Sequence, residues 1–168
     1  TNLYRNSLAA YFLPSVDEWY KSAYYEPTSG VYFNFPTGSD SEPTAVASGM
    51  AAGTAVFGQS VSQGPTDIML AGGLSSYGTM GQGGNAREWE ETDFDLINDS
   101  SSSARGFRGG YWGLGSDYLS SSNRSFVGNP SSGFFFIGFR VASIPEPSTL
   151  LLAIAAFARL LTVRPCPE

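Results

Sequence analysis

The hydrophobic positions along this chain follow helical spacing over one short segment. Residues 13–23 place Trp19 and Ala23 on one face, and they therefore predict a helix. Ser15, followed three residues later by Glu18, forms a capping box, the pattern that marks where a helix begins. This segment is the best helix candidate of the sequence.

Brief apolar or aromatic runs predict the strands. After Pro27 and Gly30, which predict a turn, the runs occupy residues 31–35, 54–57, 108–112 and 134–141. The last run, FFFIGFRV, is apolar enough to predict a buried strand, in which Arg140 needs a partner. Apart from residues 54–57, the segment 36–65 has no sustained period and predicts loop.

Composition and charge narrow the classes of function. The 168 residues suit one domain, and the 20 glycines favour a loop-rich fold. With 15 acidic and 9 basic residues the net charge is -6, so nucleic acid is a poor partner. The chain has no histidine, which excludes most histidine-based mechanisms. A single cysteine, Cys166, excludes an internal disulfide.

The pattern changes after residue 143, where Pro145 and Pro147 predict the end of the folded domain. Residues 150–161 are apolar on every helical face except at Arg159, and they predict a helix that associates with a membrane. The alternative is a terminal helix buried in the domain, because runs of roughly 10 to 14 apolar residues more often form core helices. We therefore expect a domain over residues 1–143 and a tail over residues 144–168.

Four separated segments carry a resemblance to a known family. They are LPSVDEWYKSA from Leu13, GGNAREWEE from Gly83, RGGYW from Arg108 and IGFRVA from Ile137. In this order they resemble the formylglycine-generating enzyme family, the sulfatase-modifying factor domain. The resemblance implies an irregular, loop-rich α+β fold related to C-type lectins. It also implies buried rings for the tryptophans within these motifs, Trp19, Trp89 and Trp112.

Both ends of the sequence bear on this resemblance. The family has strands and a helix ahead of the LP segment, and the chain begins at Thr1, so we expect a domain truncated at its amino terminus. At the other end, IPEPS at residues 144–148 and the apolar stretch after it resemble a PEP-CTERM sorting signal of Gram-negative exporting bacteria. The tail departs from that pattern in its shorter apolar block, which Arg159 interrupts, so the signal is degenerate.

Active members of the family hold copper between two thiolates, the soft ligands that monovalent copper requires. Matching the segment SDYLSSSNRS, with Arg124 as the retained arginine, puts Ser116 and Ser121 at the thiol positions. We therefore expect no copper and no oxidase activity. Serine hydrolysis is equally unsupported, because Ser116, Ser120 and Ser121 have no histidine to activate them.

The family also binds calcium, a hard ion that prefers oxygen ligands, around its G-N-x-x-E-W motif. The positions that match its ligands here are the carbonyls of Gly84 and Ala86 and the side chain of Glu88. Gly81 stands where the family usually supplies an Asn or Asp oxygen. Two interpretations stay open: a calcium site, or a turn fixed by Asn85 with Trp89 in the core.

Other charged residues fit structural roles. An acidic cluster resembles a glycosidase pair, but carboxylates in a short loop more often form a solvated face; its members are Glu90, Glu91, Asp93 and Asp95. Arg108 and Arg140, in the RGG and GFR motifs, are expected to brace loops or pair with buried carboxylates.

Two hypotheses of different classes follow. In the first, the chain is an exported bacterial domain at the cell envelope, non-catalytic, with a binding or structural role. Its partners are then the sorting machinery, the membrane through residues 150–161, and a carbohydrate or protein ligand. In the second, it is an oxidoreductase of the formylglycine-generating type whose metal site lies outside this chain. The serines at the thiol positions favour the first, and lectin-like sugar binding is its most concrete form.

Overall fold

The computed structural model describes residues 8–143 of the chain. The predicted tail over residues 144–168, with its apolar helix and sorting signal, lies outside the described residues. The α-helix is α1 (Val16–Tyr24), and the 3-10 helices are η1 (Val61–Gln63), η2 (Ile68–Leu70) and η3 (Ser116–Leu119). The strands are β1 (Tyr11–Phe12), β2 (Tyr25–Glu26), β3 (Val31–Tyr32), β4 (Thr44–Ala45), β5 (Thr54–Ala55), β6 (Arg87–Asp93), β7 (Arg105–Arg108), β8 (Phe126–Gly128), β9 (Ile137–Gly138) and β10 (Ala142–Ser143). The protein is thus mixed α+β, with long loops between short elements.

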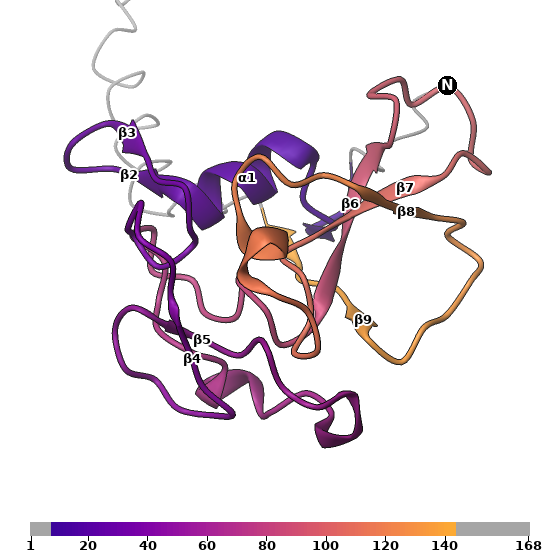
Figure 1. Ribbon diagram of the computed structural model, residues 1–168. Helices are drawn as coiled ribbons and strands as arrows, with labels where there is room; N and C mark the ends of the chain where they lie inside the picture. Colours follow the sequence, from indigo (N-terminus) through magenta and orange to yellow (C-terminus); the bar gives the residue numbers. More distant parts are fainter. Residues whose placement is uncertain (1–7, 144–168) are drawn as a thin grey trace, which may run out of the picture.

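A curled four-stranded sheet organises the fold, with the strand order β8-β7-β6-β9 (Figure 1). Strand β7 pairs antiparallel with both β6 and β8, whereas β9 lies parallel to β6 on the other side. The register places Phe107 between Trp89 and Phe126 across three strands. Residues in such a row project from the same face of a sheet, so these three rings lie on one face.

Helix α1 packs against β6 and begins where the sequence predicts. The Ser15 hydroxyl accepts a hydrogen bond from the Glu18 N–H, and the Glu18 carboxylate accepts one from the Ser15 N–H, so the capping box is confirmed. The helix buries Trp19, Ala23 and Tyr24. It ends at Tyr24, because the next residue, Tyr25, has an extended backbone and starts β2.

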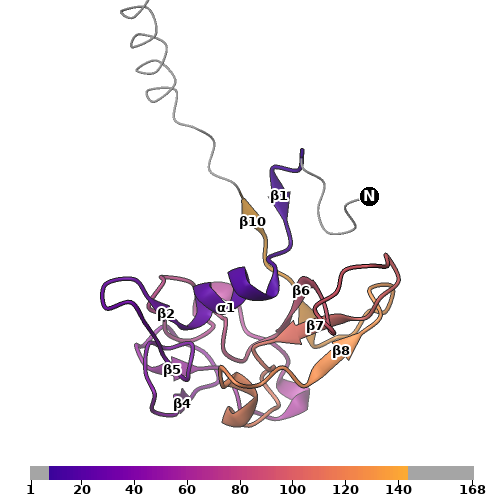
Figure 2. The same ribbon diagram turned by 90° about the horizontal axis from the view of Figure 1, so that it is seen from above.

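Smaller pairings hold the remaining segments. Strands β2 and β3 form a short antiparallel ladder, and β4 pairs parallel with β5. Strands β1 and β10 pair antiparallel, which brings the first and last elements of the described part side by side (Figure 2). In the same part of the chain, no helix has the length and apolar character needed to span a bilayer.

Each predicted strand overlaps an observed strand over one or two residues only. The runs at 31–35 and 54–57 contribute only the two-residue strands β3 and β5. The run at 108–112 is mostly loop, because Gly109 and Gly110 have φ values of 88° and 70°, a left-handed conformation that ends β7.

The prediction of a buried strand over residues 134–141 is wrong. Only Ile137 and Gly138 pair with the sheet, and the Ile137 N–H bonds to the Phe134 carbonyl, which makes a tight turn of the preceding residues. Phe135 is 70% exposed and Phe139 is 68% exposed. The aromatic rings of this run pack on one another rather than in the core. Phe134, Phe135 and Phe139 remain exposed to solvent.

Candidate functional site

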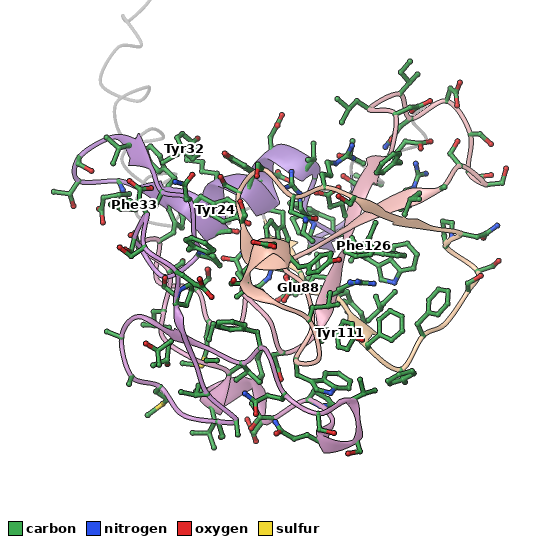
Figure 3. All side chains as sticks on the ribbon, viewed as in Figure 1. Tyr24, Tyr32, Phe33, Glu88, Tyr111 and Phe126 are labelled. Carbon is green, nitrogen blue, oxygen red and sulfur yellow. The ribbon has the colours of Figure 1, made fainter. Side chains whose placement is uncertain are left out.

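Strand β6 gives the sheet two chemically different faces, because alternate side chains of a strand point in opposite directions. Glu88 and Glu90 point toward α1 and the arginines, whereas Arg87 and Trp89 point to the aromatic face. In Figure 3, Tyr111 and Phe126 lie beside β6, and Tyr24 lies at the end of α1.

On the first face, Glu88 joins two of the recognised motifs. Its carboxylate accepts a 2.7 Å hydrogen bond from the Trp19 indole N–H. It also accepts bonds of 2.5 Å and 2.7 Å from the Arg140 guanidinium, one to each oxygen. A bidentate pair of this kind fixes the carboxylate and the guanidinium in one orientation. Glu88 therefore connects α1, through Trp19, to the segment after β9, through Arg140.

Glu90 makes a second junction on the same face. It is fully buried and pairs with Arg108 at 2.9 Å and with Arg124 at 3.2 Å. The predicted bracing role of Arg108 and Arg140 is therefore confirmed. The solvated face predicted for the acidic cluster is wrong, since Glu90, Glu91 and Asp93 are all buried and only Asp95 is exposed. Arginines from distant segments make that burial tolerable.

The two matched thiol positions lie around η3. Ser116 begins that short helix, and Ser121 follows it. The Ser121 N–H bonds to the Asn34 carbonyl, and the Ser121 carbonyl accepts from Arg108. The segment is thus fixed by its backbone, which leaves the position of Ser121 as a structural junction between η3 and β7.

Among the residues matched to the calcium ligands, Glu88 makes structural contacts. Both oxygens of Glu88 are occupied by Arg140 and Trp19, so a cation there has to displace a guanidinium. Asn85 has φ 57°, and its side-chain amide bonds to both backbone groups of Thr66. Gly84 donates its N–H to the Gly109 carbonyl. Because the carboxylate of the matched set is already paired, these contacts favour the alternative of a turn fixed by Asn85.

Tryptophan burial agrees with the motif-based expectation in two of three cases. Trp19 and Trp112 are buried, and the Trp112 indole N–H donates to the Val61 carbonyl. Trp89 is half-buried, with its ring edge-on to Phe107 at 4.3 Å between centroids. The exception lies on the aromatic face, where the cover is incomplete.

The aromatic face centres on Arg87. Its guanidinium carbon lies 3.3 Å from the ring centroid of Phe126, and 5.2 Å from those of Tyr111 and Phe136. Burial lowers the pKa of Arg87, since desolvation disfavours its charged form. Tyr118 packs against Phe126 from the side of η3.

Beyond these rings, the aromatic cluster continues to the surface. Phe136 stacks on Tyr111 and Phe134, and Phe135 contacts both Phe136 and Trp112. Phe134 and Phe135 are exposed, whereas Phe136 is half-buried. We define the aromatic platform as Arg87, Tyr111, Phe126, Phe134, Phe135 and Phe136. Its rings form a surface graded from buried to exposed, which suits contact with another molecule.

Sequence reasoning missed the platform. The triplet Phe134–Phe136 is visible in the sequence, but apolar character alone predicts burial. Nothing local in GNAREW indicates that Arg87 meets rings from three distant segments. The local signal is that Arg87 stands next to Glu88 in the sequence. Because Glu88 pairs with Arg140, Arg87 is left without that partner.

The start of α1 also borders a cavity of about 270 Å³, lined by Ser15, Val16, Asp17, Thr92 and Leu96. The Val16 N–H there already bonds to the Thr92 hydroxyl. Asp17 and Glu18 occupy the first turn, which disfavours an anion at this helix end. Among residues 8–143, no group of three or more His, Cys, Asp or Glu side chains is arranged to hold a metal ion.

The curled sheet, the packed helix and the long loops define a mixed α+β domain with one partly open sheet face. No protein-family model matches the sequence, and no curated protein matches it. Its fold is similar to that of Treponema denticola variable protein 1, with a TM-score of 0.56 and 21% identity, over 80% of this chain and 48% of that one. It is also similar to the crystal structure of CarF, with a TM-score of 0.51 and 20% identity, over 84% of this chain and 50% of that one. The chain therefore spans about half the length of either structure, and the likeness is one of fold alone.

Proposed function

We propose that this chain is a non-catalytic binding domain with the sulfatase-modifying factor-like variant of a C-type-lectin-like fold, and that a carbohydrate contacts its aromatic platform. The observation that carries the proposal is the gradation of rings from Phe126 to Phe135 on the open side of the sheet. Flat aromatic faces pack against the C–H groups of sugar rings and exclude water there. The four motif segments and their order support the fold assignment.

The charged face of the sheet supports binding rather than catalysis. Glu88 and Glu90, the carboxylates nearest to a catalytic pair, are both held in ion pairs with arginines. A general acid or base needs a free proton position near the substrate. Ser116 and Ser121 supply no thiolate at the positions where the resembled family holds copper.

The proposal includes export and a place at the cell envelope, membrane-associated through residues 150–161. Its support is the IPEPS segment and the apolar block after it. The sorting machinery is the corresponding partner. Deleting residues 145–168 tests this part: the protein is expected to leave the membrane fraction and to keep the cooperative thermal unfolding of the domain. Retention in the membrane fraction refutes it.

Binding itself is tested by titrating the protein with a panel of neutral and acidic oligosaccharides in a calorimeter. The Phe135→Ala variant is expected to lose at least tenfold in affinity for any sugar that binds. The matched control is Phe139→Ala, because Phe139 has nearly the same exposure but contacts no ring of the platform. Equal affinity in the two variants, or no binding by the unaltered protein, contradicts the proposal.

A further inference from the structure

Arg87 differs from the other arginines near the sheet in having no acidic partner. Arg105, Arg108, Arg124 and Arg140 each form an ion pair with a carboxylate. Arg87 is only 6% exposed, and within residues 8–143 its guanidinium makes no ion pair or hydrogen bond. Its Nε is fully buried without a hydrogen-bond partner. A buried cation without a counter-charge is costly, so its place needs a reason.

The rings around Arg87 account for part of that reason. Phe126, Tyr111 and Phe136 present their faces to the guanidinium and stabilise its positive charge. Ring faces accept no conventional hydrogen bond in the guanidinium plane, where all five N–H groups of an arginine point. The rings therefore cover the flat faces of the guanidinium, whereas the N–H groups at its edge keep no hydrogen-bond acceptor among residues 8–143.

We propose that this edge binds the carboxylate of an acidic sugar, so that the ligand class is the uronic-acid oligosaccharides. The inference rests on the proposed sugar-binding function and specifies its ligand. A planar carboxylate pairs with a guanidinium edge through two parallel hydrogen bonds, and a uronic acid carries such a carboxylate on a sugar ring. The sugar ring that carries the carboxylate then packs on the exposed faces of Phe134 and Phe135.

The charge of the whole chain makes this site selective. A net charge of -6 repels polyanions in general, so attraction for an acidic sugar has to come from a local cation. Lys21, the lysine of the chain, lies over the Tyr25 ring in helix α1, a different part of the molecule. Removing the charge of Lys21 therefore changes the net charge by the same amount as removing that of Arg87, without touching the platform.

The experiment compares trimers of galacturonate, glucuronate and mannuronate with their carboxyl-reduced neutral counterparts, by calorimetry at fixed ionic strength. The unaltered protein is expected to bind at least one uronate trimer tenfold more tightly than its neutral counterpart. Arg87→Gln is expected to abolish that preference while retaining the neutral affinity. Arg87→Lys, which keeps the charge but not the planar donors, is expected to lose most of the preference for the acidic trimer. Lys21→Gln is expected to keep that preference. Near-ultraviolet circular dichroism shows whether each variant is folded.

The outcomes separate this inference from the function on which it rests. If neutral and acidic trimers bind equally, or if folded Arg87→Gln and Arg87→Lys both keep the acidic preference, the inference is overturned and sugar binding stands. Tighter binding of a sulfated trimer than of every uronate overturns it as well. If no sugar of either kind binds the unaltered protein, both are overturned.

Discussion

Arg108 and Glu90 form an ion pair of 2.9 Å in which the carboxylate is completely buried. Arg124 reaches the other oxygen of Glu90 from the segment before β8. Arg108 also donates to the carbonyls of Ser121 and Asn123. A single carboxylate thus fixes the η3 segment and the sheet to one another, and its loss leaves two arginines without their counter-charge.

The substitution Glu90→Gln is therefore expected to destabilise the domain strongly. Removing one partner of a buried ion pair costs roughly 3 to 5 kcal/mol, because the remaining charge stays desolvated. Urea denaturation followed by tryptophan fluorescence measures the change. Glu26→Gln serves as the control, because Glu26 ends strand β2 and its carboxylate bonds locally to the Thr28 N–H. A similar loss in both variants contradicts the assigned role of Glu90.

Arg87 is expected to behave in the opposite way to Glu90. Replacing it with methionine removes a desolvated cation that has no acid partner, and it retains a flexible apolar chain among the rings. Cation–π contacts worth about 0.5 to 2 kcal/mol are lost, which offsets part of the gain. We expect the free energy of unfolding to stay the same or to rise, by about 1 kcal/mol at most. A fall of more than about 2 kcal/mol means that Arg87 is a structural residue.

Tyr24 makes the stability depend on alkaline pH. Burial raises the pKa of its phenol well above the usual value of 10, and its hydroxyl donates a 3.0 Å bond to the Leu119 carbonyl. The folded state therefore holds a proton that the unfolded state releases above pH 10. The Tyr24 contribution is fully present below that pH and is lost as the pH rises further.

Thermal unfolding between pH 8 and pH 11 tests this linkage. The usual pKa of a tyrosine phenol is 10. Above that pH, the melting temperature of the Tyr24→Phe variant is expected to fall less steeply than that of the unaltered protein. Near pH 8 the variant is expected to be less stable by about 0.5 to 1.5 kcal/mol, because the hydrogen bond to Leu119 is absent. Parallel pH profiles of the two proteins contradict the linkage.

Calcium is expected to leave the domain unchanged. Arg140 holds both oxygens of Glu88, so no carboxylate of the G-N-x-x-E-W motif is free to ligate an ion. Melting temperatures in excess calcium and in excess chelator should agree within the error of the measurement. A calcium-dependent rise, by the linkage between binding and folding, shows that an ion displaces Arg140 or binds elsewhere in the chain.

Local patterns in the sequence predicted local structure well. The capping box depends on residues three positions apart, so Ser15 and Glu18 were sufficient to place the start of α1. The arginine–carboxylate roles of Arg108 and Arg140 followed from motif resemblance, although their partners did not. The mixed α+β class also followed from that resemblance, whereas composition indicated only a loop-rich fold.

Contacts between distant segments escaped the same reasoning. Whether the acidic cluster is solvated depends on Arg108 and Arg124, which approach Glu90 from other strands and loops. Whether residues 134–141 form a buried strand depends on how much of the sheet edge is free, and β6 accommodates only two residues of β9. The aromatic platform forms only when β6, β8 and the loops that carry Tyr111 and Phe136 come together. No local sequence pattern predicts it.

The pairing of β1 with β10 also determines how the domain responds to mechanical force. Tyr11 lies opposite Ser143, and Phe12 lies opposite Ala142, so the chain enters and leaves the ladder at the same end. Tension between residues 8 and 143 then opens this two-residue ladder one pair at a time, as in a zip, rather than shearing all its bonds together. The ladder is short and separate from the main sheet, so it gives way before the Glu90 junction is loaded. The described domain is thus expected to lengthen under tension first where its two ends meet.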